Sequence, residues 1–210
     1  MSEIKPNENE KTVLNLFYNR FYDLYDELSG DNFFDHEPGY RLLKIRETFS
    51  VYKEVLGYEP IKEYLAYIKN GGRPPLDGFI ADDLFSFVRN VLLHFPIFDT
   101  WDEVYISKIL ATWNKEGTIH KFLLKSTKIK IDNKGTIKYR IWQNSKKQMS
   151  YISINLPERY DENKIFLKEI VSEKDGIKFC ISFMKKILDT QVYSNETEDI
   201  VIMSQVYIPK

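Results

Sequence analysis

Apolar residues recur at helical spacing through roughly the first 125 positions of the chain. Between Val13 and Leu28 an apolar side chain returns every third or fourth residue, and Gly30 supplies a stop signal. The same spacing predicts four further helices, at residues 40–56, 60–68, 77–95 and about 99–125. Gly57 ends the helix at 40–56. Pro96 ends the helix at 77–95, because the residue before a proline avoids helical backbone. This part of the chain is therefore predicted to be a helical bundle.

After residue 127 the period changes from that of a helix to that of a strand. Isoleucine and lysine alternate at 128–131, the sequence DNKG at 132–135 signals a turn, and a second alternating segment follows at 137–142. A third strand over 151–156 would extend this hairpin into an antiparallel meander, with three residues facing inward: Ile152, Ile154 and Leu156.

The remaining pattern completes the expected fold. A long helix is predicted from about 162 to 188, with Gly176 as a candidate break, and the segment 199–208 has the composition of a final strand. The chain is thus expected to be mainly α, and α+β overall. Residues 1–126 would form the helical bundle, and residues 127–210 the basic meander with the C-terminal helix packed on the bundle. At 210 residues, one compact unit with a single core is expected.

The sequence also argues against membrane insertion, disulfides and metal sites. The first residues, MSEIKPNENEKT, lack the apolar core of a signal peptide, and no apolar run reaches bilayer length. We therefore expect a cytoplasmic protein without a membrane partner. Cys180 is the only cysteine, which excludes an intramolecular disulfide and a cysteine-type zinc site, and its apolar neighbours predict a packing role. The DHE sequence at 35–37 lacks metal-ligand spacing, so neither metal nor cofactor is expected.

Charge is distributed unevenly along the chain. Residues 121–150 hold nine Lys or Arg and a single acid, whereas the rest of the chain carries a net negative charge. Five residues of this segment are predicted to form a solvent-facing ribbon that contacts RNA phosphates and stacks an indole on a base: Lys128, Lys130, Lys138, Arg140 and Trp142. The alternative is a sheet edge whose lysines only prevent aggregation.

Polar residues also interrupt the apolar stretch DDLFSFVRNVLLHFPIFDTWDE at 82–103. On a helical wheel they fall within one sector of roughly 140°, together with Leu93. We call this sector the polar seam; its members are Asp82, Asp83, Ser86, Arg89, Asn90 and His94. The remaining positions are apolar, so the helix is predicted to be buried on most sides, with the polar seam forming a wet surface or lining a cleft.

The sequence RNVLLH, from Arg89 to His94, resembles the R-N-x-x-x-H signature of the HEPN superfamily, which includes many metal-independent ribonucleases. The longer stretch FVRNVLLHFPIFDTWDEVYISKIL is similar in layout to the motif region of HepT-type toxins. The resemblance covers about 25 of the 210 residues, and the preceding helices suit a HEPN bundle. One position departs from the pattern: HepT-type toxins have Tyr two residues after the His, where this chain has Pro96.

The resemblance implies a metal-independent endoribonuclease with a bacterial toxin-antitoxin or phage-defence role. It further implies a homodimer in which two motifs form one cleft, and it allows a nucleotidyltransferase antitoxin as partner. His94 would act as acid or base, Arg89 would stabilise the charged phosphate, and Asn90 would orient either group. Two alternatives stay open. The chain could be a non-catalytic HEPN module that binds RNA or protein, or a plain helical scaffold in which Arg89 pairs with Asp82 or Asp83 and His94 caps its helix.

Overall fold

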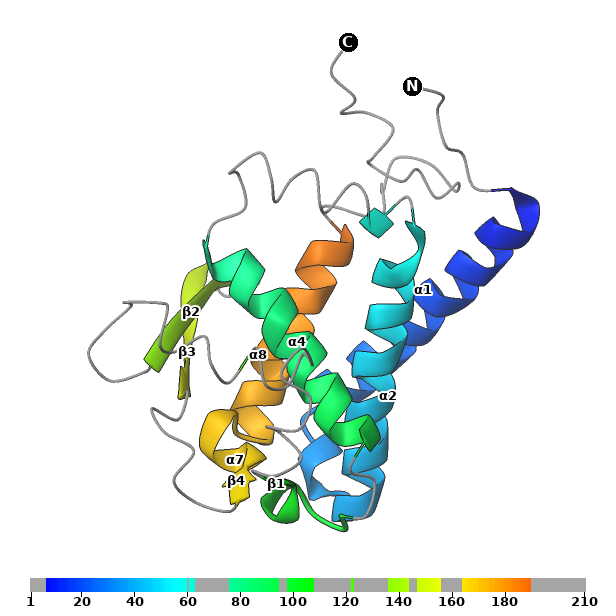
Figure 1. Ribbon diagram of the computed structural model, residues 1–210. Coiled ribbons are helices and arrows are strands. Elements are labelled where there is room, and N and C mark those ends of the chain that lie inside the picture. Colours follow the sequence, from blue (N-terminus) through cyan, green and yellow to red (C-terminus); the bar gives the residue numbers. More distant parts are fainter. Residues whose placement is uncertain are drawn as a thin grey trace.

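The structure is a computed structural model, and the part of the chain that it describes holds helices and two small sheets. The described residues are 7–59, 61–62, 76–94, 98–107, 122, 136–143, 147–155 and 164–189, with the backbone alone at 76–82, 136–143 and 155. The elements in chain order are α1 (Glu8–Ser29), η1 (Phe33–Asp35), α2 (Pro38–Gly57), α4 (Leu76–His94), η2 (Trp101–Glu103), β1 (Tyr105–Ser107), β2 (Thr136–Gln143), β3 (Gln148–Asn155), β4 (Lys164–Phe166), α7 (Leu167–Ile170) and α8 (Lys174–Ile187) (Figure 1). Here η denotes a 3-10 helix. The described fold is mainly helical, as the sequence predicted.

The first two predicted helices are confirmed, although each begins earlier than its apolar pattern does. α1 starts with a capping box, in which Asn7 Oδ1 accepts from the Glu10 backbone N–H at 2.9 Å and Glu10 Oε2 accepts from the Asn7 N–H at 2.7 Å. Gly30 ends α1, as predicted. α2 begins at Pro38, whose fixed φ suits the first helical turn. The capping box at α1 and the proline at the start of α2 therefore extend these helices beyond the residues that face the core.

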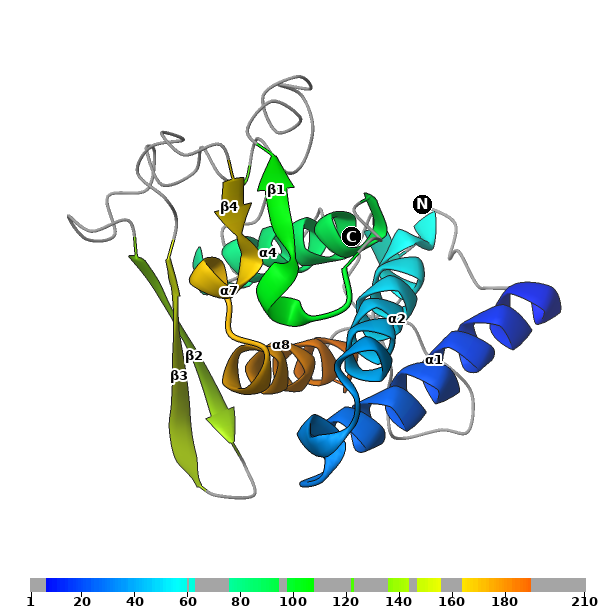
Figure 2. The same ribbon diagram turned by 90° about the horizontal axis from the view of Figure 1, so that it is seen from below.

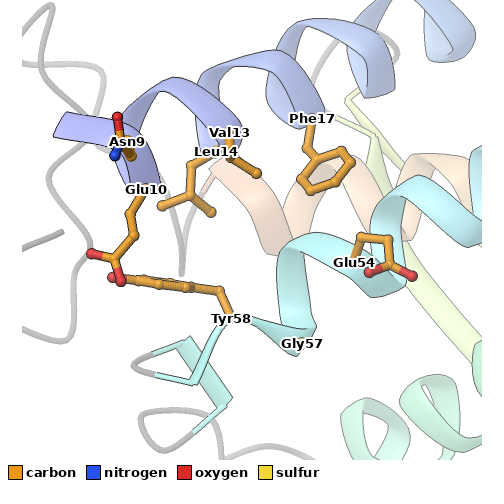
Figure 3. A pocket seen from close by; sticks show the side chains of 8 residues that line it. All are labelled: Asn9, Glu10, Val13, Leu14, Phe17, Glu54, Gly57 and Tyr58. Atoms are coloured by element: carbon orange, nitrogen blue, oxygen red, sulfur yellow. The ribbon is translucent and has the colours of Figure 1, made fainter. Parts of the chain in front are cut away.

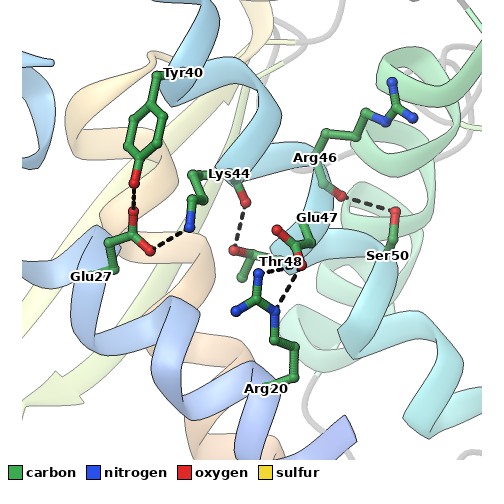
Figure 4. A network of polar contacts seen from close by, with 8 residues as sticks. All are labelled: Arg20, Glu27, Tyr40, Lys44, Arg46, Glu47, Thr48 and Ser50. Atoms are coloured by element: carbon green, nitrogen blue, oxygen red, sulfur yellow. Dashed lines mark hydrogen bonds and ion pairs between the residues drawn. The ribbon is translucent and has the colours of Figure 1, made fainter. Parts of the chain in front are cut away.

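α1 and α2 lie side by side, and two ion pairs join them on their outer surface (Figure 4). Lys44 Nζ donates to Glu27 Oε2 at 2.8 Å, and Arg20 Nη2 donates to Glu47 Oε1 at 2.5 Å. α2 also contacts α4, so it is the middle helix of the three (Figure 1). The position of α2 brings its outer face next to the polar seam of α4.

α4 confirms the predicted fourth helix, which ends at His94; residues 95–97 lie outside the described part of the chain. Six apolar side chains of α4 are buried: Leu84, Phe85, Phe87, Val88, Val91 and Leu92. The Phe85 ring packs edge-on against Phe49 and Tyr52 of α2, with ring centroids 6.0 and 5.7 Å apart. α4 is therefore a core element on every side except its polar seam.

α8 packs against α1, α2 and β3 and closes the core on the side of the molecule seen in Figure 2. Its buried face includes Ile177, Cys180 and Met184. A bidentate ion pair joins the start of α8 to α2: Arg41 Nε and Nη2 donate to the two carboxylate oxygens of Glu173 at 2.8 and 3.1 Å. Buried residues from both halves of the chain thus belong to one hydrophobic core.

The second hairpin of the predicted meander is present as β2 and β3, which pair antiparallel from Thr136 with Asn155 to Gln143 with Gln148. β3 begins three residues before the predicted start, at Gln148 instead of Tyr151. Ile154 is fully buried and Ile152 is half-buried, as expected for inward-facing positions. The predicted strands at 128–131 and 199–208, the third predicted helix beyond Lys62, and Leu156 lie outside the described residues.

Two sequence predictions were wrong. The helix expected from residue 99 does not begin there, because η2 is followed by the strand β1, which pairs antiparallel with β4. Val104 and Ile106 are fully buried while Tyr105 between them is half-buried, which is a strand alternation. The helix expected from 162 to 188 is instead divided into β4, α7 and α8.

The division falls at Val171, whose carbonyl accepts from the Trp101 indole N–H at 3.0 Å in a buried hydrogen bond. Gly176, the candidate break, lies inside α8 instead. A side chain there would meet Val171, so the glycine permits close packing between α8 and the residues before it. No helix within the described ranges is both long and apolar enough to cross a membrane.

Candidate functional site

The polar seam of α4 faces away from the core, as the wheel predicted. Asp83, Ser86, Arg89 and Asn90 are half-buried, and His94 is exposed at the last position of the helix. The Asp82 side chain lies outside the described part of the structure. Because α4 is fixed by six buried apolar side chains, the seam is carried on a rigid support.

Arg89 is held between the seam and α2. Its Nη1 donates to Asn90 Oδ1 at 3.1 Å, and its Nη2 lies 3.7 Å from Glu54 Oε1. Its Nε is buried and has no hydrogen-bond acceptor among the described residues. Arg89 is 32% exposed and Glu54 is 56% exposed, so solvent screens the pair and it contributes little to stability. A phosphate could therefore replace the Glu54 carboxylate at the guanidinium.

Glu54 is the residue that sequence reasoning missed, since it named partners for Arg89 only in the alternative of a plain helical scaffold, where Arg89 would pair with Asp82 or Asp83. The structure shows an ion pair of Arg89 that crosses from α4 to the outer face of α2. Glu54 stands 35 positions before Arg89, and no periodic pattern links residues on two different helices. The one signal in the sequence is that Glu54 follows the half-buried Ser50 by four residues, which places both on the polar outer face of α2.

His94 and Arg89 do not converge within one copy of the chain. Arg89 and His94 are five positions apart on α4, and this spacing separates their Cα atoms by about 140° around the helix axis and about 7.5 Å along it. Asn90 is one turn before His94 and hydrogen-bonded to Arg89, so it lies between them on the seam. The exposed imidazole stands in the last turn of α4, at the C-terminus of the helix.

The predicted basic ribbon is described in part. The backbone register of the hairpin pairs Lys138 with Ser153, Arg140 with Tyr151 and Trp142 with Met149. All three partner positions on β3 are exposed, with the Tyr151 side chain 69% accessible. Lys128 and Lys130 lie outside the described residues. The exposed Tyr151 and Met149 were not among the predicted RNA-binding residues, although Tyr151 provides an aromatic surface of the kind that stacks on bases.

The structure also describes the Cys180 thiol and a second histidine, His36. The Cys180 thiol is fully buried, and this burial raises its pKa well above the usual value, so the reactive thiolate is disfavoured. Groups of three or more His, Cys, Asp or Glu side chains able to hold a metal ion are absent from the described ranges. His36 is exposed next to η1 and packs its ring near Phe33 and Tyr40, with centroids 6.4 and 5.1 Å away.

Comparison with known proteins gives no match, whether to a protein-family model, a curated protein or a solved structure. The functional argument therefore depends on the chemistry of the side chains on α4. These combine a permanent cation, an amide that orients it and an exposed imidazole on one rigid helix. Such a set can bind a phosphate and move protons beside it.

Proposed function

We propose that the protein is a metal-independent endoribonuclease of the HEPN type, acting as a homodimer in a bacterial toxin-antitoxin or phage-defence role. The observation that carries the proposal is the polar seam of α4. A helix buried on its other sides presents Arg89 and Asn90 joined by a hydrogen bond, and it ends in the exposed His94. These three residues belong to the sequence RNVLLH, which resembles the R-N-x-x-x-H signature of HEPN ribonucleases.

The chemistry suits cleavage at a ribose 2'-hydroxyl. One imidazole takes the proton from the 2'-oxygen as that oxygen attacks the phosphorus, and the 5'-oxygen leaves with a proton from an acid. The products are a 2',3'-cyclic phosphate and a free 5'-hydroxyl. Arg89 places positive charge next to the phosphate oxygens, where negative charge accumulates in the transition state. Asn90 holds the guanidinium through the 3.1 Å hydrogen bond that its Oδ1 accepts from Nη1.

A second copy of the chain is required because Arg89 and His94 diverge on their helix. A twofold axis near α4 would bring two seams together, so that His94 of each copy approaches the phosphate held by Arg89 of the other copy. Leu93, which is only half-buried in a single chain, lies on the same face and would be covered by this contact. Light scattering at micromolar concentration should show a dimer, and a strict monomer contradicts the composite site.

The direct test is RNA cleavage by the purified protein in EDTA. The variants Arg89→Ala and His94→Ala should each reduce cleavage by about 10² to 10⁴, because each removes a group that acts in the transition state. Thermal stability should be almost unchanged in His94→Ala, since an exposed side chain leaves no cavity. His36→Ala is the matched control, because it removes an exposed histidine from another surface and should retain activity. Cleavage that persists in His94→Ala contradicts the mechanism.

One observation favours a second candidate, a non-catalytic module that binds RNA or protein. The Glu54 carboxylate faces Arg89 and partly neutralises the site at which a phosphate would bind. A wild-type protein that retains RNA in a binding assay but leaves it intact would support this candidate. The Glu54→Gln variant should then bind RNA more tightly, because the competing anion is removed.

A further inference from the structure

A hollow of about 370 Å³ opens between the first half of α1 and the last turn of α2, next to the candidate site (Figure 3). Two carboxylates line it, Glu10 from α1 and Glu54 from α2. Val13 and Phe17 lie between them along α1 (Figure 3). The hollow therefore has an apolar middle and a negatively charged group toward each end.

The length of the hollow along α1 follows from the rise of the helix. Glu10 and Phe17 are seven residues apart on α1, which corresponds to about 10 Å along the axis. Glu54 lies at the Phe17 end of the hollow, and Glu10 lies at the other end beside Tyr58 (Figure 3). A single metal ion cannot bridge two carboxylates at this separation, because carboxylate ligands stand within about 2.6 Å of the ion.

Each carboxylate can accept a further hydrogen bond. Glu10 Oε2 accepts from the Asn7 N–H at 2.7 Å, and the Glu10 carboxylate also accepts from the Tyr58 hydroxyl, whose pKa is raised by burial and by this negative neighbour. A carboxylate offers about four lone-pair positions, so Glu10 retains acceptor capacity. Glu54 faces Arg89 at 3.7 Å in a half-exposed pair, which a better-placed cation can replace.

We propose that the hollow binds a linear aliphatic polyamine, with one ammonium group on Glu10, another on Glu54 and the methylene chain against Val13 and Phe17. Such a ligand matches both carboxylates and the apolar middle of the hollow at once, because its charged ends flank an apolar chain. Phe17 and Tyr58 add aromatic rings, which attract ammonium groups. An alkyl monoamine would leave one carboxylate without a cation, and a metal ion would leave the apolar middle empty.

Glu54 couples this hollow to the candidate site, because the same carboxylate faces the Arg89 guanidinium. An ammonium group on Glu54 competes with Arg89 and releases its guanidinium for a phosphate. Coupling of this kind is reciprocal, so a phosphate on Arg89 would strengthen polyamine binding by the factor by which the polyamine strengthens phosphate binding. Removal of the guanidinium takes away the group that competes for Glu54, so it should also strengthen polyamine binding. The binding event stands independently of RNA cleavage; only its effect on the enzyme rests on the proposed function.

The test is calorimetric titration of the nuclease-treated full-length protein, without RNA, with spermidine and with α,ω-diamines of increasing length. Affinity should rise with chain length until both carboxylates are reached, and the matching monoamine should bind about tenfold more weakly. Glu10→Gln and Glu54→Gln should each weaken binding by about tenfold, since a charge-assisted hydrogen bond is lost. Glutamine also supports a capping box, so Glu10→Gln keeps the start of α1.

Glu59→Gln is the matched control, because Glu59 is an exposed carboxylate that pairs with Lys62 and does not line the hollow. It should bind the diamine like the wild type. Arg89→Gln should bind the diamine about two- to fivefold more tightly, as expected for loss of a weak competing ion pair. Equal binding of monoamine and diamine, or equal loss in Glu59→Gln and Glu54→Gln, overturns the site. An unchanged affinity in Arg89→Gln overturns the coupling.

Cleavage assays separate the two proposals. A protein that binds diamines with this pattern and never cleaves RNA would disprove the nuclease and keep the polyamine site. A protein that cleaves RNA through Arg89 and His94 but shows no diamine preference would keep the nuclease and disprove the hollow as a polyamine site.

Discussion

Replacing Gly176 by alanine tests how α8 is seated in the core. A Cβ atom at this position would lie 2.5 Å from Val171 Cγ2 and 3.1 Å from Ser172 Oγ, both of which are too close for ordinary contacts. Forced overpacking of this kind costs about 1 to 3 kcal/mol. Alanine recovers up to about 1 kcal/mol of that cost through its better helix propensity. We therefore expect Gly176→Ala to lower the free energy of unfolding by about 1 kcal/mol.

Gly57→Ala is the matched control, because Gly57 also lies in a helix but a Cβ there would meet nothing within 4 Å. Its expected effect is an increase in the free energy of unfolding of about 0.4 to 1 kcal/mol, since alanine restricts the unfolded chain. Urea unfolding followed by circular dichroism measures both variants, and the denaturant slope should stay constant. If Gly176→Ala is as stable as the wild type, or if both variants shift in the same direction, the close approach of Val171 to α8 is refuted.

Two further predictions concern titratable groups. The single thiol, Cys180, is fully buried with a raised pKa, so a thiol reagent should modify it in the unfolded protein and leave it unmodified in the native protein; rapid native labelling would contradict this burial. Burial alone would raise the pKa of Glu27, but hydrogen bonds from Lys44 and Tyr40 outweigh it and the pKa is lowered from 4.5. A lowered carboxyl pKa stabilises the fold above the unfolded value, and this stabilisation is lost as pH falls through the folded value. Glu27→Gln should therefore be less stable than the wild type at pH 7 and approach it in acid, and a pH-independent difference in unfolding midpoint would exclude this linkage.

The helices that form the core were the most predictable part of the fold. α1 and α2 each bury one face, and α4 buries every side except its polar seam, so polar and apolar residues alternate with the helical period over five or more turns. The ends of α1 and α2 were less predictable, because capping depends on polar residues such as Asn7 and Glu10 that carry no apolar period. Local chemistry therefore determined these ends, and the buried faces determined the helices themselves.

The short strands could not be predicted from local pattern. β1 and β4 have three residues each and pair Tyr105 with Phe166 and Ser107 with Lys164, positions more than 50 residues apart in sequence. Three residues contain too little alternation to distinguish a strand from one turn of an apolar helix. The pairing of β1 with the distant β4 makes both segments strands. Because β4 is a strand, it also interrupts the helix that was expected from residue 162.

The candidate site was predictable along one helix and not between helices. The polar seam follows from the positions of Arg89, Asn90 and His94 on a single wheel, and the structure places all three on the outer side of α4. Glu54 comes from α2, and its position next to Arg89 depends on how α2 and α4 pack. Contacts that arise from packing between elements have no signature in the sequence of either element.

The surroundings of Arg89 suggest where control of the site would be exerted. Six buried side chains hold α4 in the core, so the seam cannot move without disrupting packing. Glu54 is more than half exposed and shares its carboxylate between the guanidinium and the hollow, so its side chain can move at little cost. Because Arg89 is on a fixed helix and the Glu54 side chain can move, the access of a phosphate to Arg89 would depend on the group that binds the Glu54 carboxylate. Substitution of Glu54 would therefore change the site without unfolding the helix that carries it.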